Sequence, residues 1–397
     1  MKVGGSHLGY CTNIHPGESW DEIRGNLERY LPRVKRQVSP DAPFGVGLRL
    51  SAIAAQSLRA PESLAQFVSF LRDNDLYVFT INGFPYGPFH GTRVKEDVYL
   101  PDWRDEARLD YTNLLADLLA ALLPEDSDRY GTISTVPGAF KPNADSPEAV
   151  TRIADQLVRH VAHLVSLERD TGRTIVLALE PEPCCLLETI DETVAFFRDH
   201  LYAERAVANL AALAGIDADR AADALRRHLG VCLDLCHAAV EFEDAADCLD
   251  ALARAGIAVA KMQVTAGLRI PHVTSDSIST LQTFDEAVYL HQVVERAAGA
   301  LHRYVDIGVA CASDTWRRGD SEWRVHFHVP VFVEQLEGFA STQSFVRATL
   351  DLHRQRARTP HLELETYTWS VLPASARNVP MDEAIARELL WVQRELQ

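Results

Sequence analysis

The chain has 397 residues, of which 47% are hydrophobic, and its formal net charge is −17 at pH 7. This length allows one large domain or two ordinary ones, and the hydrophobic fraction is ample for a buried core. The negative charge argues against nucleic acid as the main partner, because proteins that bind its phosphate backbone need a basic surface. It argues equally against binding to an anionic membrane surface.

The seven cysteines are scattered along the chain, and none belongs to a CxxC pair. An odd number without a regular framework predicts reduced thiols, as in a cytosolic protein. The N-terminal residues MKVGGSHLGYCTN lack the apolar stretch of a signal peptide, and no run approaches the ~20 apolar residues that cross a bilayer. We therefore expect a cytoplasmic protein without membrane insertion, which is free to form a homo-oligomer.

Short apolar runs alternate with longer helical patterns along the whole chain. The runs that predict strands are, in chain order, 8–15, 44–51, 76–83, 131–138, 174–183, 230–237, 258–265 and 361–368. The clearest helical patterns are 61–74, 146–172, 244–256 and 381–396. The second of these opens with Ser-Pro and stops at a glycine, which is typical of the two ends of a helix.

Eight strand–helix units with strands that are apolar on both faces predict an α/β protein, a (β/α)8 TIM barrel in a single domain over 1–397. A doubly wound open sheet is the alternative. No GxGxxG follows the first strand, which disfavours that alternative.

Two long insertions interrupt the regular alternation. The first, 84–112, follows the third strand, and its proline, glycine and aromatic residues suit a structured lid. The second, 266–335, lies between the seventh and eighth strands. It contains a further strand-like run, WRVHFHVPVF (323–332), which we place over the mouth of the barrel.

Polar groups recur toward the C-terminal ends of four predicted strands. Because side chains alternate between the two faces of a strand, the following residues share a face within their own strand: Glu180 and Glu182; Cys232, Asp234 and Cys236; Lys261, Gln263 and Thr265; Glu363, Glu365 and Tyr367. Active sites of TIM barrels lie at the C-terminal face. Four strands are therefore expected to deliver polar groups to one rim.

Carboxylates inside an apolar barrel repel one another, and each costs on the order of several kcal/mol to desolvate unless it is compensated. One divalent metal ion would supply that compensation. Carboxylate oxygens with an imidazole nitrogen suit Mn, Zn, Fe or Co, and a shell richer in oxygen suits Mg. The predicted ligands are Glu180, Asp234, His328 and Glu365, with Glu363 as the alternative to Glu365 if the register differs.

Further residues are candidates for contact with a substrate. His326 and His328 share one face of an apolar run, so we expect at least one of them to reach the site, and we assign His326 to the substrate. The other candidates for substrate contact are His7, Asn82, Glu182, His237 and Gln263. Structural explanations compete with these roles: His237 as a core histidine, Gln263 as a buried amide, and Lys261 as the partner of a carboxylate.

The motifs LALEPEP, CLDLCH and LELET, with a polar residue on the seventh strand, resemble the xylose isomerase-like barrel superfamily. That superfamily includes sugar isomerases, ketose epimerases and apurinic endonucleases. The resemblance implies metal ligands at Glu180, Asp234, position 263 and Glu365, with His237 completing a DxxH motif. Gln263 stands where the superfamily usually has histidine.

Three longer motifs, HLGYCTNIHPGESW (7–20), RVHFHVPVF (324–332) and ETYTWSVLP (365–373), resemble the family of metabolite traffic protein EboE. This resemblance extends along the chain. It implies a role in making or moving a small secreted metabolite, beside a cyclitol synthase-like enzyme and a prenyltransferase.

These residues together predict a metal-dependent isomerase or epimerase of a sugar, sugar phosphate or cyclitol. Glu180 and Glu365 would exchange a proton at the carbon beside a carbonyl, and Lys261 would stabilise the charge of the enediolate. The 84–112 lid, with His90, Arg93 and Trp103, would close over the ligand and exclude water.

Two other functions compete with this one. A phosphodiester hydrolase of the apurinic endonuclease kind would need more histidines, yet FGVGLRLS has none and LYVFTING ends near Asn82. A non-catalytic metabolite-binding or traffic protein is favoured by Gln263. The carboxylates of the three other strands oppose it, because buried charge without a use is costly.

Overall fold

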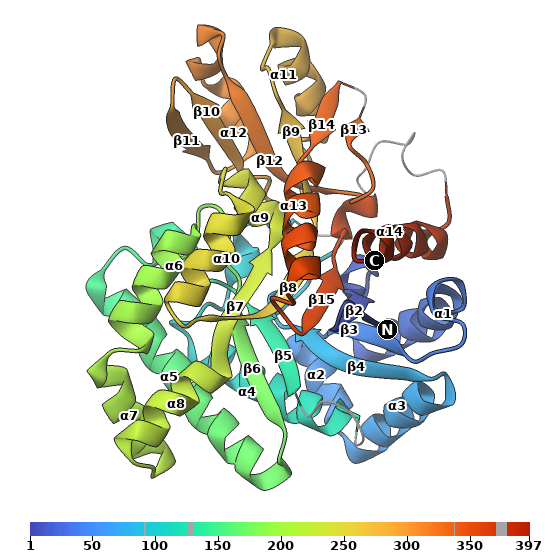
Figure 1. Ribbon diagram of the computed structural model, residues 1–397, viewed down its shortest axis with the longest axis vertical. Coiled ribbons are helices and arrows are strands. Elements are labelled where there is room, and N and C mark those ends of the chain that lie inside the picture. Colours follow the sequence, from blue (N-terminus) through green and yellow to red (C-terminus); the bar gives the residue numbers. More distant parts are fainter. Residues whose placement is uncertain (91–92, 125–129, 337, 371–378) are drawn as a thin grey trace.

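The computed structural model describes residues 1–90, 93–124, 130–336, 338–370 and 379–397. Its nine-stranded sheet has the strand order β1-β2-β15-β8-β7-β6-β5-β4-β3. Neighbours from β2 onward are parallel, and a parallel bridge between Cys11 and Gly47 joins the two ends of the sheet into a barrel. The predicted (β/α)8 barrel is confirmed (Figure 1). The strands are β1 (Lys2–Val3), β2 (Ser6–Tyr10), β3 (Phe44–Arg49), β4 (Leu76–Asn82), β5 (Tyr130–Thr135), β6 (Thr174–Leu179), β7 (Leu229–Asp234), β8 (Ala258–Val264) and β15 (His361–Leu364).

Helices surround the barrel and cover the outer face of its sheet (Figure 1). They are α1 (Trp20–Val38), α2 (Ala52–Leu58), α3 (Pro61–Asp73), α4 (Glu106–Leu122), α5 (Pro147–Thr171), α6 (Ile190–Phe196), α7 (Glu204–Ala214), α8 (Ala218–His228), α9 (Leu235–Val240), α10 (Ala245–Arg254), α13 (Gln343–Gln355) and α14 (Met381–Glu395). The ends of α5 follow the expected chemistry. The Ser146 hydroxyl accepts a hydrogen bond from the Ala149 amide, and Gly172 closes the helix in the left-handed conformation.

Most barrel strands end several residues before the apolar runs do, because the carboxyl-end residues enter turns and short helices. The run 230–237 is the clearest case. Strand β7 ends at Asp234, and α9 begins at Leu235. The run 8–15 divides in the same way, with β2 ending at Tyr10 and a 3-10 helix at Thr12–Ile14.

A second, antiparallel sheet lies beyond the C-terminal end of the barrel, in the upper part of Figure 1. It has six strands in the order β11-β10-β12-β9-β14-β13, all from the segment between β8 and β15. The strands are β9 (Ala266–Ile270), β10 (Val293–Ala297), β11 (Ala300–Tyr304), β12 (Glu322–Val329), β13 (Gln335–Leu336) and β14 (Phe339–Ser341), accompanied by α11 (Ser275–Leu281) and α12 (Ile307–Ala312). The run 323–332 thus forms β12, and the sequence did not reveal that its neighbours complete a sheet.

The segment 84–112 after β4 has two parts, and two of its residues, 91–92, lie outside the described chain. Its later part belongs to the barrel wall, because α4 begins at Glu106 with Asp105 as its N-terminal cap. Its earlier part contains a 3-10 helix at Lys95–Tyr99. The backbone amides of Val94 and Lys95 donate to the Val288 carbonyl, which joins this segment to the inserted sheet's loops.

Within the described residues, no helix is both long and apolar enough to cross a bilayer. All seven cysteines lie in described residues, and none forms a disulfide. Reduced thiols were expected from their spacing.

Gly47 on β3 provides a test of how closely the barrel interior is packed. A Cβ atom at this position would lie 1.8 Å from Oε1 of Glu363, which is fully buried. We expect Gly47→Ala to lower the free energy of unfolding by ~1–3 kcal/mol, as overpacking does. Gly25, in α1, has no atom within 4 Å of its would-be Cβ, so Gly25→Ala is expected to add ~0.5–1 kcal/mol. Urea unfolding of both variants measures the two changes in the free energy of unfolding. An unchanged free energy of unfolding in Gly47→Ala would show that the barrel interior can rearrange to accept the methyl group.

Candidate functional site

A pocket lies at the C-terminal mouth of the barrel. Its deeper wall is polar and contains Asn13, Asn82, Glu180, Glu182, His237, His326, His328 and Glu365. Its outer wall is largely apolar and contains Phe84, Pro85, Phe89, Val94, Val98, Tyr289, Leu290 and Tyr367. The insertion after β4 supplies the first five of these outer residues.

Asp234 occupies the last position of β7, and its two carboxylate oxygens have different surroundings. The Oδ1 atom accepts hydrogen bonds from the backbone amides of Cys236 (2.7 Å) and His237 (3.0 Å) and from the Thr265 hydroxyl (2.7 Å). It therefore caps α9 and orients its first turn. The Oδ2 atom is buried and has no hydrogen-bond partner, and the Nε2 atom of His237 lies 3.9 Å from it. The Oδ1 atom thus has a local structural role, and Oδ2 faces the site.

Glu180 lies just beyond the end of β6, beside Asp234 and Glu365. One oxygen from each of these three carboxylates lies within 4.8 Å of the others, and all three residues are buried. Burial, together with the charges of Glu365 and Asp234, raises the pKa of Glu180 well above its ordinary value. Its Oε2 atom has no hydrogen-bond partner. Such crowding of buried carboxylates favours either a bound proton or a bound cation.

Glu365 is held in a different way from Glu180, because amide groups reach both of its oxygens. Its Oε1 accepts from the side-chain amides of Asn13 and Asn82, the latter at 2.9 Å, and its Oε2 accepts from Gln263 at 2.7 Å. Burial and the Asp234 charge nevertheless raise its pKa well above the ordinary value. Glu365 is thus a positioned group, whereas Glu180 is unconstrained by hydrogen bonds at Oε2.

Gln263 on β8 stands where a histidine ligand was expected by resemblance, and its contacts explain the difference. Its amide nitrogen donates to Glu365, and its amide oxygen accepts from the Cys232 thiol at 3.1 Å. Asn13 was not among the residues predicted from the sequence. The signal was available, since Asn13 follows the first barrel strand as Asn82 ends the third.

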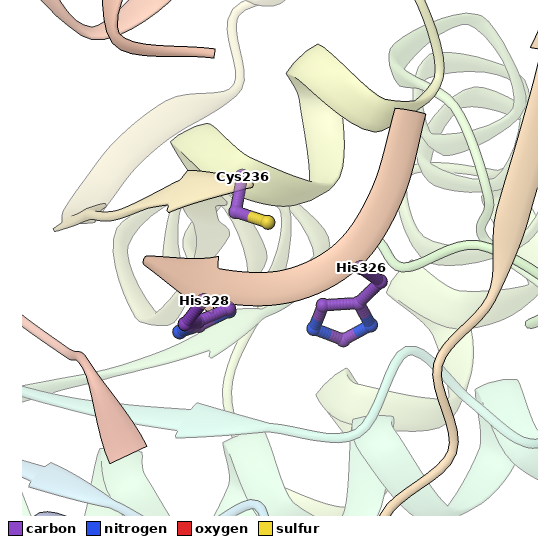
Figure 2. Close-up of side chains that lie close together, drawn as sticks. All are labelled: Cys236, His326 and His328. Carbon is purple, nitrogen blue, oxygen red and sulfur yellow. The ribbon is translucent and has the colours of Figure 1, made fainter. Parts of the chain in front are cut away.

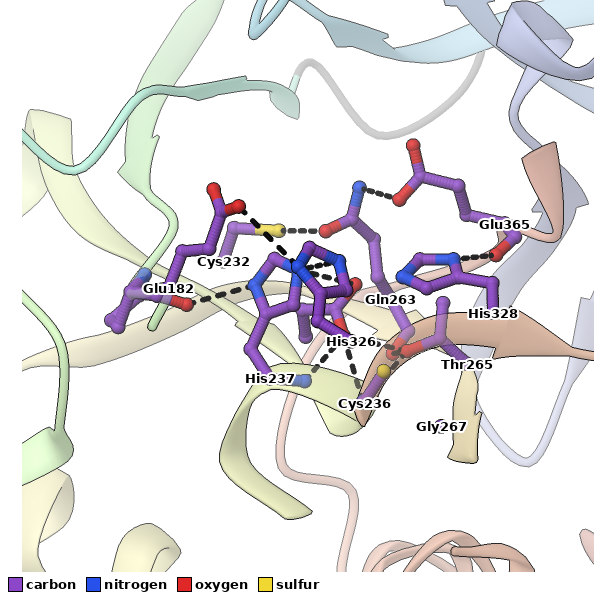
Figure 3. Close-up of polar contacts among 12 residues, drawn as sticks. Glu182, Cys232, Cys236, His237, Gln263, Thr265, Gly267, His326, His328 and Glu365 are labelled. Atoms are coloured by element: carbon purple, nitrogen blue, oxygen red, sulfur yellow. Dashed lines mark hydrogen bonds and ion pairs between the residues drawn. The ribbon is translucent and has the colours of Figure 1, made fainter. Parts of the chain in front are cut away.

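Three imidazoles, those of His237, His326 and His328, lie together at the mouth (Figure 3). They share one hydrogen-bonding pattern. The Nδ1 atoms of His237, His326 and His328 lie 2.9, 2.7 and 2.7 Å from the Pro181 carbonyl, the Gln292 side-chain oxygen and the Glu365 carbonyl, respectively. Each of these oxygens accepts, so each Nδ1 donates. This leaves the Nε2 lone pair of each neutral ring available to a cation, which is the usual arrangement of metal-binding histidines.

The position of His326 and His328 depends on an irregularity in β12. Val325 pairs with Leu268 of β9 and Val329 pairs with Ala266, so the register shifts across the residues between them. Bulges of this kind redirect side chains beside active sites. Figure 2 shows both imidazoles on the same side of β12, with Cys236 of α9 nearby. Burial raises the pKa of the Cys236 thiol well above its ordinary value, which disfavours the thiolate form that binds metal.

Glu182 lies at the other side of the pocket, where it belongs to a network that the sequence did not indicate. Its Oε1 accepts from the Tyr99 hydroxyl (2.7 Å) and from the Gln292 amide (3.1 Å). Its Oε2 is buried and has no partner. Tyr99 comes from the insertion after β4 and Gln292 from the insertion before β10, and neither has a strand pattern that would place it here.

Lys261 requires a correction. It is fully buried on β8, two residues before Gln263, and therefore points into the barrel one layer below the mouth. Its ammonium lies 2.5 Å from Glu363 Oε2 and 3.3 Å from the Ser134 hydroxyl. It is not among the residues that line the pocket. The structural alternative, a partner for a carboxylate, holds instead of the expected role at an enediolate.

His7 also lies away from the site, because it is the second residue of β2 and so at the opposite end of the barrel. It contacts the Tyr77 hydroxyl at 2.9 Å and stacks on Phe79. His15 is stacked on Tyr30. Neither histidine reaches the pocket.

Of the three residues expected to close the lid, one is at the mouth. His90 contacts the Asn13 carbonyl at 2.5 Å and the Tyr289 hydroxyl at 2.7 Å. Arg93 is exposed and pairs with Glu96. Trp103 is buried in the barrel wall, where its indole donates to Thr135. The expectation for Arg93 and Trp103 was wrong, since the segment turns back into the wall before α4.

Among the described residues, four groups of three side chains bring their possible ligand atoms within 4.8 Å of one another. They are Glu180, Asp234 and Glu365; Asp234, His237 and His328; Glu182, His237 and His326; and Cys236, His326 and His328. The first two groups share Asp234. Glu180 Oε2 and Asp234 Oδ2 in the first group, and His328 Nε2 in the second, are buried without a hydrogen-bond partner. Each of these two groups therefore fits a divalent cation at the mouth.

No protein-family model matches the chain. No curated protein matches it either. A solved structure of a xylose isomerase-like TIM barrel protein from Mycobacterium smegmatis, in complex with magnesium, is similar over 100% of this chain and 98% of its own, with 12% identity and a TM-score of 0.51.

Two further solved structures are similar at lower TM-scores. The IolI protein with a bound zinc atom is 11% identical over 98% of this chain and 97% of its own, with a TM-score of 0.45. The probable 3-DHS dehydratase AsbF from Bacillus anthracis is 14% identical over 97% of both chains, with a TM-score of 0.43. At 12% identity, the Mycobacterium smegmatis structure shows the fold alone, a xylose isomerase-like TIM barrel.

Proposed function

We propose that this protein is a divalent-metal-dependent isomerase of a small polyhydroxylated substrate, acting by carboxylate-mediated proton transfer. The observation that carries the proposal is Glu180. Its Oε2 is buried at the pocket without a hydrogen-bond donor, beside Asp234 and Glu365. In the absence of a cation, burial and the charges of these neighbours raise its pKa above the ordinary value, and a carboxylate oxygen without a hydrogen bond can accept a proton from a substrate.

The residues that would hold the ion are Glu180, Asp234 and Glu365, and His328 belongs to a neighbouring group of possible ligands that shares Asp234. Their oxygen-rich set, with one imidazole, suits Mn, Co, Fe, Zn or Mg. When bound, such an ion would polarise a carbonyl and an adjacent hydroxyl of the substrate. Its positive charge would also relieve the repulsion between the buried carboxylates.

The two glutamates have unequal roles in this proposal. Glu180 takes a proton from the carbon beside the carbonyl and returns it to the carbonyl carbon, while the proton of the adjacent hydroxyl moves to the carbonyl oxygen. Glu365 accepts hydrogen bonds from three amides and serves to hold charge and position. One mobile base suffices to move a proton between adjacent carbons on one face of a substrate. This favours isomerisation over epimerisation, which needs a second acid on the opposite face.

The pocket favours a neutral substrate over a sugar phosphate. Apart from the histidines, Lys95 is the single cation among its described lining residues, and it lies 2.5 Å from Asp306. A phosphate would therefore meet three glutamates and a lysine that already has a partner. Asn82, Glu182, His237 and His326 offer hydrogen bonds to hydroxyl groups, as expected for a sugar or a cyclitol derivative.

Exchange of substrate hydrogen with solvent tests this proposal. The protein, supplied with Mn²⁺, Co²⁺ or Mg²⁺, is incubated in D2O with neutral aldoses, ketoses and keto-cyclitols, and proton NMR follows each compound. We expect deuterium to enter at the carbon beside the carbonyl. Ligand binding without exchange in every compound would instead indicate a metabolite-binding protein on the same barrel.

Three further properties are proposed on the sequence alone. The first is a role in producing or exporting a small secreted metabolite, as the resemblance to the metabolite traffic protein EboE family implies. The second is a cytoplasmic location, and the third is assembly as a homo-oligomer. The neutral to acidic pocket supports a small-molecule substrate in preference to a nucleic acid.

A further inference from the structure

The two insertions meet beside the pocket, at Val288. The backbone amides of Val94 and Lys95, from the insertion after β4, donate to the Val288 carbonyl at 2.8 and 2.9 Å. The ammonium of Lys95 also lies 2.5 Å from Asp306 in the inserted region before β15. The residue after Val288 is Tyr289, which lines the pocket. The contact between the insertions therefore fixes the backbone next to a pocket residue.

A chain of hydrogen bonds leads from this contact to Glu365. The Tyr289 hydroxyl lies 2.7 Å from Nδ1 of His90, and Nε2 of His90 lies 2.5 Å from the Asn13 carbonyl. The side-chain amide of Asn13 donates to Oε1 of Glu365. The four residues come from the two insertions, from the turn after β2 and from the end of β15. The chain thus links four segments that are far apart in sequence.

The direction of each hydrogen bond follows from the groups that can only accept. Burial lowers the pKa of His90, so its ring is neutral near pH 7 and has one donor and one acceptor. The Asn13 carbonyl only accepts, so Nε2 of His90 carries the hydrogen. Nδ1 then accepts, and the Tyr289 hydroxyl donates to it. An ionised Glu365 also only accepts, so the amide nitrogen of Asn13 faces it.

Asn13 depends on His90 because its own side chain is held at one end only. Its amide nitrogen donates to Glu365, whereas its Oδ1 is buried and has no hydrogen-bond partner. Asn82, the other amide on the same Glu365 oxygen, is held at both ends, since its Oδ1 accepts from the Phe84 backbone amide at 3.0 Å. The orientation of the Asn13 side chain therefore follows that of its backbone, which His90 holds at the carbonyl.

We propose that His90 is a positioning residue that couples the contact between the two insertions to Glu365. It acts through Asn13, and Tyr289 holds its ring in place. Glu365 is then fully oriented only when both insertions lie over the pocket, so that closure completes the site. This inference rests on the proposed function for the importance of Glu365, but the hydrogen-bond chain can be tested without it.

Affinity for Mn²⁺ tests the link to Glu365, which is one of the proposed ligands. The full-length protein is stripped of metal with a chelator and titrated with MnCl2 in a calorimeter. The binding event that Asp234→Asn removes identifies the carboxylate site. Loss of an outer contact that holds a metal ligand typically weakens binding by ~10–100-fold.

Three variants of the chain give graded expectations. His90→Leu should weaken Mn²⁺ binding by about 10-fold, at the low end of that range, because Asn82 and Gln263 still hold Glu365. Tyr289→Phe should weaken it less, since the ring of His90 remains. His90→Gln keeps a donor for the Asn13 carbonyl and should restore the wild-type affinity.

Hydrogen exchange tests the chain in the absence of any metal. Mass spectrometry of the metal-free protein follows amide exchange in the peptide 8–15, which contains the turn of Asn13. Exchange reports local opening of the backbone. His90→Leu and Tyr289→Phe should each exchange this peptide faster than the wild type, although Tyr289 is far from it in sequence. His90→Gln should exchange it at the wild-type rate.

Tyr304→Phe is the matched control for Tyr289→Phe. The Tyr304 hydroxyl donates to Glu295 at 2.7 Å within the inserted sheet, and Tyr304 does not line the pocket. Its loss should change neither the Mn²⁺ affinity nor the exchange of 8–15. Thermal unfolding establishes that each variant is folded, and Tyr289→Phe with His90→Gln keeps the test if His90→Leu does not fold.

Wild-type Mn²⁺ affinity in folded His90→Leu and Tyr289→Phe would overturn the coupling to Glu365 and would leave the proposed ion site intact. If the wild type binds no Mn²⁺, the proposed function fails, and hydrogen exchange alone decides this inference. Faster exchange of 8–15 in Tyr289→Phe would then support the chain, and unchanged exchange would overturn it. The two proposals therefore fail separately.

Discussion

Glu180→Gln is expected to slow exchange of substrate hydrogen with deuterium by ~10²–10⁴-fold, the contribution typical of a general base. Glutamine keeps the size of the side chain but cannot take the proton. Because Glu180 Oε2 has no hydrogen-bond partner, the fold should not depend on its charge. Proton NMR in D2O measures the rate, and metal analysis of the same sample separates loss of the base from loss of the ion.

Glu388→Gln provides the matched control for this variant. Glu388 is a fully buried carboxylate on α14 that accepts hydrogen bonds from the Val331 amide and the Thr366 hydroxyl, outside the pocket. The Glu388→Gln variant should exchange substrate hydrogen with deuterium at the wild-type rate. Equal rates in Glu180→Gln and wild type would remove Glu180 as the base.

Lys261→Met is expected to lower the free energy of unfolding by ~3–5 kcal/mol, the cost of leaving a buried charge without its partner. Lys261 and Glu363 are both inaccessible to solvent and lie 2.5 Å apart. The double variant Lys261→Met/Glu363→Leu should recover most of the loss, because an apolar pair replaces the ion pair. Urea unfolding of the single and double variants measures both effects.

An exposed ion pair gives the control for this prediction. Arg72 pairs with Asp73 at the surface, and Arg72→Met should change the stability by no more than ~1 kcal/mol. The double variant at 261 and 363 should also retain deuterium exchange, since we assign Lys261 a structural role. If the double variant folds stably but does not exchange substrate hydrogen with deuterium, Lys261 takes part in the reaction and our structural assignment is wrong.

The barrel was predictable from the sequence because its strands are continuous apolar runs separated by capped helices. Helix α5 shows this most clearly, with Ser146 and Gly172 at its ends as expected. The ends of the strands were less predictable. In the run 230–237 the apolar pattern continues through α9, and the capping role of Asp234 is invisible without the amides it accepts from.

The carboxylates of the candidate site were predictable because a charged residue in an apolar strand needs a reason. Alternation along each strand placed Glu180, Asp234 and Glu365 on one rim, and the structure brings them together. Alternation between faces does not show, however, which layer along the barrel axis each side chain reaches. Lys261 and Gln263 share a face of β8, but only Gln263 reaches the layer of Glu365.

The inserted sheet was the least predictable part of the site. Its strands are short, and their order, β11-β10-β12-β9-β14-β13, follows from pairings between residues far apart in sequence. Gln292 and Tyr99 meet Glu182 only because two separate insertions fold over the same mouth. The motif 365–373 also extends past residue 370 to positions outside the described chain.

The central claim is that the carboxylate mouth holds a divalent ion, and metal analysis of protein purified without chelator tests it most directly. Asp234→Asn is the informative variant, because asparagine keeps the oxygen that caps α9 and replaces the orphaned Oδ2 with an amide. The account predicts bound Mn, Zn, Co, Fe or Mg in the wild type and less of it in Asp234→Asn. It would be contradicted by folded wild-type protein that carries no ion and gains none when these ions are added.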